Sequence, residues 1–343
     1  MSNDADVLEI AGSSVQVGQR VRLNIPVATA FDSTPLHMPV EVIRGKKPGP
    51  ALFISAAIHG DEIIGTEVIK ALLMRKRLLA SIRGTLILVP IVNVFGYNRN
   101  VRYLPDRRDL NRCFPGAEHG SLAGQFAYTF MHQIVRHCTH GIDLHTGAVN
   151  RTNLPQIRAS LDDPETRQLA QAFGVPVVLN ADVRDGSLRQ AVKNLGIPML
   201  LFEGGEALRV EKKVVQSALN GIIHVMRLIE MLPSNKRFHA VRSKHVYIAH
   251  NSHWLRAPQS GCFQTVKQLG HQVEKGEPIA RITDPFGDEV GRIVAQATGI
   301  IIGMSTLPLV TNGEAVFHVA TFKDSDAVEE QLETYEDALL DTI

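Results

Sequence analysis

From Ala51 onward, apolar runs of strand length alternate with stretches that have the apolar spacing of helices. The apolar runs cover residues 51–58, 85–92, 141–144, 176–179 and 198–202, and the helical stretches cover roughly 62–80, 121–138, 163–173, 186–195 and 209–231. Ser121, Asp163 and Ser187 are the predicted N-caps of three of these helices. Continuous Val, Ile and Leu runs separated by helices are typical of strands covered on both faces. The alternation therefore predicts an α/β fold with a mostly parallel or mixed central sheet flanked by helices.

Two further regions flank this α/β core. Residues 7–43 look β-rich, and a polar, basic stretch at 233–244 ends the helical rhythm. Beyond it, the segments 260–282 and 297–319 share one plan, in which a Gly-containing turn separates two β runs, and this predicts a small all-β domain. We therefore expect an α/β domain over residues 1–235, a small β domain over 240–322 and an acidic tail or helix over 323–343.

The predicted β domain contains a turn, GHQVEKGEPI at 270–279, that resembles a turn of biotinyl and lipoyl carrier domains. The fold of those domains is called a barrel-sandwich hybrid. They present a modified lysine on a hairpin, whereas the corresponding hairpin here, 283–291, contains no lysine. The resemblance implies a barrel-sandwich-like fold for this domain, and the missing lysine argues against a carrier role.

Charge, the length of apolar runs and cysteine content argue against several partners and locations. Lys and Arg number 36 against 35 Asp and Glu, so no overall field favours nucleic acid or an anionic membrane. The longest strongly apolar run, 86–95, is too short to span a bilayer, and the N-terminus lacks the pattern of a secretory signal. The three cysteines are odd in number and far apart, which fits no disulfide framework. We expect a cytoplasmic protein, and the sequence leaves homo-oligomers open.

Three candidate metal ligands follow two of the predicted strands. His59 and Glu62 come after the apolar run 51–58, and His145 comes directly after the run 141–144. Open α/β sheets bind ligands beyond the carboxyl ends of their strands, so the three side chains can meet at one edge. Imidazole and carboxylate groups are common Zn²⁺ ligands, and three of them leave a fourth position for water. The spacing therefore predicts a catalytic zinc site.

A general base and a substrate anchor can come from other predicted strand ends and loops. Glu203 directly follows the apolar run 198–202 and precedes two glycines, which allow a substrate to approach, so its carboxylate is the candidate base. In the loop 108–116, the guanidinium of Arg112 and the amide of Asn111 can hold a substrate carboxylate.

An oxyanion partner and a support for His145 stay open at this point. One of the arginines upstream of the loop, Arg99, Arg102, Arg107 or Arg108, could stabilise the oxyanion of a tetrahedral intermediate. Asp143 shares the strand face of His145, and it can either hydrogen-bond that histidine or form a simple turn contact.

Four motifs in this order, HGDE, DLNRCFPG, DLH and FEGG, resemble those of the succinylglutamate desuccinylase and aspartoacylase family. This family is a branch of the zinc carboxypeptidase-like hydrolases, and the resemblance covers roughly residues 45–320. Carried over by motif, it implies zinc ligands at His59, Glu62 and His145, a general base at Glu203, and carboxylate binding by Asn111 and Arg112. It also implies that Arg102 polarises the scissile carbonyl and that Asp109 orients a histidine ligand.

One departure from the family pattern concerns the catalytic arginine. The gap between Arg102 and Asp109 is longer here than in the aspartoacylases, so Arg107 or Arg108 could act in place of Arg102. Residues and resemblance together predict a zinc-dependent deacylase, with one Zn²⁺ per chain, that hydrolyses the amide bond of a small anionic N-acyl amino acid or related compound. Two alternatives stay open, which are a metallocarboxypeptidase acting on peptides and a non-catalytic metal-binding protein.

Overall fold

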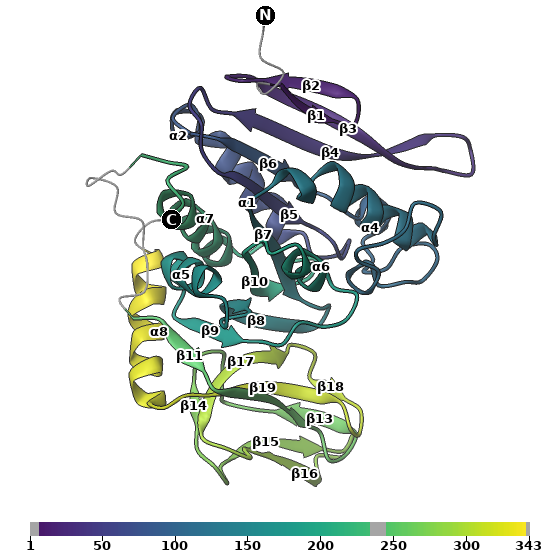
Figure 1. The fold of residues 1–343 in the computed structure, drawn as a ribbon. Helices are drawn as coiled ribbons and strands as arrows, with labels where there is room; N and C mark the ends of the chain where they lie inside the picture. Colours follow the sequence, from purple (N-terminus) through teal and green to yellow (C-terminus); the bar gives the residue numbers. More distant parts are fainter. Residues whose placement is uncertain (1–6, 234–244, 341–343) are drawn as a thin grey trace, which may run out of the picture.

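The computed structural model describes residues 7–233 and 245–340, so most of the predicted basic linker at 233–244 lies outside the described residues. A mixed sheet of thirteen strands runs through the described chain, and a four-stranded and a two-stranded sheet accompany it. Helices lie along both faces of the large sheet (Figure 1). The predicted fold class, a mixed central sheet flanked by helices, is confirmed.

The middle of the large sheet is parallel. The strands up to residue 206 are β1 (Val7–Ile10), β2 (Ser13–Gln16), β3 (Arg20–Thr29), β4 (Pro35–Arg44), β5 (Ala51–Ala56), β6 (Thr85–Val89), β7 (His140–Gly147), β8 (Arg151–Ala159), β9 (Val177–Asn180) and β10 (Met199–Glu206). β1 and β2 form the two-stranded sheet, and the others belong to the large sheet. β6, β5, β7 and β10 are parallel neighbours in that order. β4 adds antiparallel to β6, and β8 adds antiparallel to β10. The carboxyl ends of the four parallel strands therefore lie at one edge.

Two hydrophobic cores lie on the two faces of this sheet. The helices are α1 (Ile64–Met74), α2 (Lys76–Leu79), α3 (Val94–Arg99), α4 (Leu122–Gln133), α5 (Pro164–Phe173), α6 (Leu188–Asn194) and α7 (Lys212–Leu228), with 3-10 turns η2 (Leu110–Arg112) and η3 (Val135–His137). Leu52 and Ile54 of β5 pack into a core with α1, α5 and α7, whereas Phe53 packs into a core with α4 and α6. Because side chains alternate along a strand, β5 joins the two cores.

Three helices begin at the N-cap residues that the sequence predicts. The side chains of Ser121, Asp163 and Ser187 each accept a hydrogen bond from a backbone N–H three residues on, so the three predicted N-caps are confirmed. The stretch predicted as one helix over 62–80 divides into α1 and α2 at Arg75.

The C-terminal strands continue the large sheet and add a second one. They are β11 (Tyr247–Ala249), β12 (Asn251–Arg256), β13 (Gly261–Gln264), β14 (Gln272–Val273), β15 (Pro278–Thr283), β16 (Glu289–Val294), β17 (Gly299–Ser305), β18 (Leu309–Val310) and β19 (Ala315–Thr321). β17 pairs with β8 on one side and with β19 on the other. The four-stranded sheet, β16-β15-β13-β18, shares a core with these strands that includes Phe263, Ile282 and Phe317. The predicted strand-rich C-terminal region is confirmed.

The last helix, α8 (Ser325–Leu340), lies beside the C-terminal strands (yellow in Figure 1). It buries the side chains of Val328, Leu332 and Tyr335. The Tyr335 hydroxyl and the Ser217 hydroxyl of α7 form a hydrogen bond of 2.8 Å. α8 therefore contacts both the C-terminal strands and α7. Among the described residues, none of the helices is both long enough and apolar enough to cross a membrane.

Candidate metal centre and catalytic site

The loop after β5 carries two of the predicted ligands into the interior. His59 and Glu62 are 4% and 2% exposed, and α1 begins only at Ile64, directly after this loop. Gly60 allows the loop to pack against α3, because a Cβ there would lie 2.0 Å from the carbonyl carbon of Gly96. The loop therefore requires glycine at this point in order to place its His and Glu side chains.

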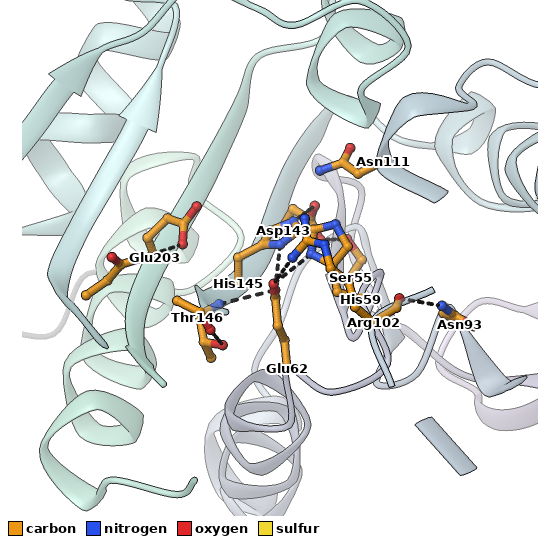
Figure 2. A network of polar contacts seen from close by, with 12 residues as sticks. Ser55, His59, Glu62, Asn93, Arg102, Asn111, Asp143, His145, Thr146 and Glu203 are labelled. Atoms are coloured by element: carbon orange, nitrogen blue, oxygen red, sulfur yellow. Dashed lines mark hydrogen bonds and ion pairs between the residues drawn. The ribbon is translucent and has the colours of Figure 1, made fainter. Parts of the chain in front are cut away.

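His59, Glu62 and His145 converge on one point (Figure 2). Their candidate ligand atoms all lie within 4.8 Å of one another, and all three side chains are buried. The Glu62 carboxylate contacts Nδ1 of both histidines at 2.7 Å, through Oε1 to His59 and through Oε2 to His145. Two imidazoles and one carboxylate form a ligand set suited to Zn²⁺. The three residues could therefore hold a metal ion.

The other nitrogen of each histidine is held by an aspartate. His59 Nε2 lies 3.0 Å from Asp109 Oδ1, and His145 Nε2 lies 2.7 Å from Asp143 Oδ2. The Ser55 hydroxyl donates to the second oxygen of Asp143 at 2.7 Å. Such contacts fix the ring orientation of metal-binding histidines and leave the opposite nitrogen for the metal. Of the two roles left open for Asp143, the structure shows the contact with His145.

Burial and charge act in opposite directions on these groups. Burial alone would raise the pKa of Glu62, but His59 and His145 beside it hold that pKa below its ordinary value. Burial alone would lower the pKa of His145, yet Asp143 and Glu62 raise it well above its ordinary value. Histidines bind metals as neutral imidazoles, so metal binding at this site competes with protonation of His59 and His145.

Of the four candidate arginines, Arg102 is the one that lines the site cavity in the described chain. Arg102 Nη1 donates to Glu62 Oε1 at 3.2 Å, and Nη2 donates to Asp109 Oδ2 at 3.1 Å. The side chain of Arg108 is 60% exposed and lies 3.8 Å from Asp106, and Arg107 is also exposed. The structure therefore brings Arg102 to the candidate metal ligands and leaves Arg107 and Arg108 outside the cavity.

Asn111 and Arg112 lie on the short turn η2, next to the candidate metal ligands. Asp109 caps this turn by accepting a hydrogen bond from the Asn111 backbone N–H at 2.9 Å. The Asn111 side-chain oxygen accepts from the backbone N–H of Leu188 at 2.9 Å, which orients its amide at the start of α6. Both Asn111 and Arg112 line the cavity that contains the three ligands.

Glu203 stands beside His145 because of the strand register. The two residues are direct partners in the parallel pair of β10 and β7. Asn153 Nδ2 donates to Glu203 Oε2 at 2.9 Å, and Figure 2 shows Glu203 to one side of the ligand cluster, with Asn111 on the other. Glu206, the local competitor, instead accepts from the Asn150 backbone N–H and does not line this cavity. Glu203 therefore lines the same cavity as the three candidate ligands.

Sequence reasoning missed several residues of the site cavity, which has a volume of about 130 Å³. The additional lining residues are Thr146, Arg158, Arg184, Ser187, Arg189 and Leu201. Thr146 directly follows His145, and its backbone N–H donates to Glu62 Oε2 at 3.2 Å. Arg158 comes from β8, a strand that the apolar pattern did not indicate. The sequence offered a signal for two of these residues. Thr146 directly follows the candidate ligand His145, and Ser187 is a predicted N-cap.

Comparisons with known proteins identify related sequences. The sequence profile of the succinylglutamate desuccinylase/aspartoacylase catalytic domain matches residues 48–229. The N-alpha-acetyl-L-2,4-diaminobutyric acid deacetylase of Halomonas elongata is 23% identical over 304 residues, which cover 84% of this chain and 86% of that protein.

Two solved structures show the same fold. The product-bound ectoine utilization protein EutE (DoeB) from Ruegeria pomeroyi has a TM-score of 0.78 at 23% identity, with 88% of this chain and 95% of that chain covered. A succinylglutamate desuccinylase/aspartoacylase from Rhodobacter sphaeroides has a TM-score of 0.78 at 24% identity, with 89% and 96% covered. The fold of this chain is therefore similar to theirs over most of its length.

Proposed function

The chain belongs to the succinylglutamate desuccinylase/aspartoacylase family, and on that premise we propose that it is a zinc-dependent deacylase of small N-acyl amino acids or related N-acylated compounds. The observation that carries the proposal is the convergence of His59, Glu62 and His145 on one point, with Glu203 directly beside His145. The deacetylase name of the Halomonas elongata relative supports a small N-acyl substrate.

Zinc is the proposed metal, with one ion per chain held by His59, Glu62 and His145. The donor set suits it, and Asp109 and Asp143 already hold the outward nitrogen of each histidine. When bound, Zn²⁺ supplies Lewis acidity, which polarises a carbonyl and lowers the pKa of water from ~15.7 towards ~7.

Glu203 is the proposed general base. Its carboxylate accepts the proton of the attacking water and then returns it to the leaving amine. Asn153 holds Oε2 at 2.9 Å, which leaves Oε1 directed to the side where Arg158 Nε lies 3.8 Å away. The Glu203 side chain is 15% exposed, so a bound substrate can reach it while most of its surface is kept from water.

Arginines supply the proposed substrate contacts. The Arg102 guanidinium lies against Glu62, next to the proposed metal position, where it can stabilise negative charge that develops on the carbonyl oxygen. Asn111 and Arg112 hold a substrate carboxylate, since an Arg fork matches the geometry of a carboxylate. The Arg and Asn donors in the cavity wall favour a substrate that carries a carboxylate.

A substrate panel with a matched variant pair tests this proposal. Zinc-loaded protein is offered N-acetyl and N-succinyl amino acids alongside short peptides, and release of the free amine is measured. Glu203→Gln should lower kcat by ~10²- to 10⁴-fold with unchanged zinc content. Glu206→Gln, which alters a nearby carboxylate outside the cavity, should keep most of the activity.

Each alternative has its own signature in this panel. Cleavage of peptides alone would replace the proposal by a metallocarboxypeptidase. Zinc binding without turnover of any substrate would favour a non-catalytic metal-binding protein. Full activity of Glu203→Gln would remove Glu203 from its proposed role.

A further inference from the structure

A cavity of about 240 Å³ lies between α7, α8 and β8, and it is called here the α8 cavity. None of its described lining residues lines the cavity at the candidate metal centre. Asn153 connects the two regions, because it lines the α8 cavity while its amide donates to Glu203 at 2.9 Å. The α8 cavity is therefore a separate space, outside the proposed substrate site.

Polar contacts hold both halves of α8, which forms one wall of this cavity. In the first half, Glu329 accepts a hydrogen bond from the backbone N–H of Gln272 on β14 at 2.9 Å. In the second half, Glu336 pairs with Lys213 of α7 at 3.3 Å. Because the helix is attached at both places, the cavity is a preformed part of the fold.

Most of the wall is aliphatic. Buried side chains from three elements line it, and these are Leu332 and Leu339 of α8, Val214 of α7 and Leu154 of β8. The loop between β13 and β14 adds the partly buried side chain of Leu269. Aliphatic groups gain free energy when they leave water for such surroundings. The wall therefore favours a ligand with an aliphatic body.

One carboxylate at this cavity has no cationic partner in the described chain. Of the described charged lining residues, Lys213 and Glu336 pair with each other, and Glu211 remains. Within residues 7–233 and 245–340, no Lys, Arg or His lies at ion-pair distance from the Glu211 carboxylate. Burial, and then the charge of Glu206, raise the pKa of Glu211. A cation bound beside Glu211 would offset both effects.

We propose that the α8 cavity binds a small aliphatic amine, with its ammonium group on the Glu211 carboxylate and its alkyl body against the leucines and Val214. A neutral apolar ligand would leave Glu211 without a partner. An anion would meet a lining in which carboxylates outnumber cations. The inference goes beyond the proposed deacylase function and does not depend on it, because the two cavities share no described lining residue.

A matched pair of ligands tests the proposed class. Calorimetry with the full-length protein at neutral pH compares n-hexylamine, which is protonated there, with n-hexanol, which has the same chain without the charge. The amine should bind with a Kd of ~1 mM or tighter. It should bind about tenfold more tightly than the alcohol, since hydrogen bonds between charged groups are the strong ones. Equal binding of the two, or no saturable binding of the amine, would overturn the proposal.

A pair of charge variants locates the ammonium group. Glu211→Gln removes the unpaired charge, so the affinities for amine and alcohol should come within about twofold of each other. Glu333→Gln alters an exposed carboxylate of α8 that does not line the cavity, and the preference for the amine should persist. An unchanged preference in Glu211→Gln would place the amine elsewhere, for example at the metal centre, and would overturn the proposal.

A cavity-filling variant tests the position of the alkyl body. Leu269→Trp places a larger side chain in the cavity from a partly buried loop position, and circular dichroism checks that the variant folds. The folded variant should bind neither ligand, and full binding of the amine would contradict the proposal even if Glu211→Gln did not fold. Hydrolysis assays of the same samples report separately on the deacylase function, since neither Glu211 nor Leu269 lines the cavity at the metal centre.

Discussion

Asp143 offers a direct test of how two aspartates support the proposed metal centre. Its carboxylate is 1% exposed, contacts His145 Nε2 at 2.7 Å and accepts from the Ser55 hydroxyl at 2.7 Å. Asp143→Asn keeps the size and one acceptor oxygen, and the Ser55 hydroxyl can turn to accept from the new amide. The substitution therefore removes the charge and leaves the packing in place.

The expected size of the effect follows from burial. Loss of a partner that orients a metal-binding histidine weakens metal affinity by ~10- to 100-fold, or ~1.4 to 2.8 kcal/mol. Asp143 should fall near the upper end because its side chain is 1% exposed. Asp109→Asn should fall near the lower end, because that side chain is 18% exposed and also contacts Arg102. We therefore expect a larger loss for Asp143→Asn than for Asp109→Asn.

Zinc affinity is measured by competition with a chromophoric chelator at one fixed neutral pH. Asp162→Asn, which alters an exposed aspartate, is the control and should bind zinc as the unaltered protein does. Affinity of Asp143→Asn within about twofold of the control would refute the proposed support of His145. A larger loss in Asp109→Asn would refute the argument from burial.

Three further predictions address stability and the base. The raised pKa of His145 favours its protonated form in the folded metal-free protein, so this stabilisation is complete below ~6.5 and is lost as pH rises through the folded pKa. The Tm of metal-free protein should fall over that range, and a flat profile would contradict the charge argument. Gly303→Ala places a Cβ 2.9 Å from Asn153 Oδ1, so kcat should drop by about tenfold with unchanged zinc content, whereas an unaltered kcat would mean that Asn153 does not hold Glu203. Tyr335→Phe should lower the free energy of unfolding in urea by ~1 to 2 kcal/mol, and equal stability would exclude a contribution from its hydroxyl contact with α7.

The sequence predicted the parallel part of the sheet because its signals there are local. Buried parallel strands read as continuous apolar runs, and their carboxyl ends meet at one edge by topology alone. His59, His145 and Glu203 each follow such a run, and the structure places their side chains at that edge. The N-caps could be predicted equally well, because a cap depends on a side chain and a backbone N–H that are only three residues apart.

The contribution of β8 could not be predicted in this way. Its sequence, RTNLPQIRA, mixes polar and apolar residues and contains Pro155, which argues against a strand inside a sheet. Its place between β10 and β17 depends on pairing with a segment about 150 residues later. Asn153 and Arg158, the β8 residues whose side chains lie at the Glu203 carboxylate, were missed together with the strand that carries them.

The pairing of β8 with β17 also limits how this molecule can move. Gly303, Met304 and Ser305 of β17 are register partners of Asn153, Thr152 and Arg151 of β8. This pairing joins two halves of the molecule, which are the α/β part that carries Asn153 and the C-terminal strands. A hinge opening between these halves would have to break this ladder, at a net cost of ~0.5 to 1.5 kcal/mol for each hydrogen bond. We therefore expect entry and exit of small molecules to depend on loops and side chains at the cavity mouth more than on separation of the two halves.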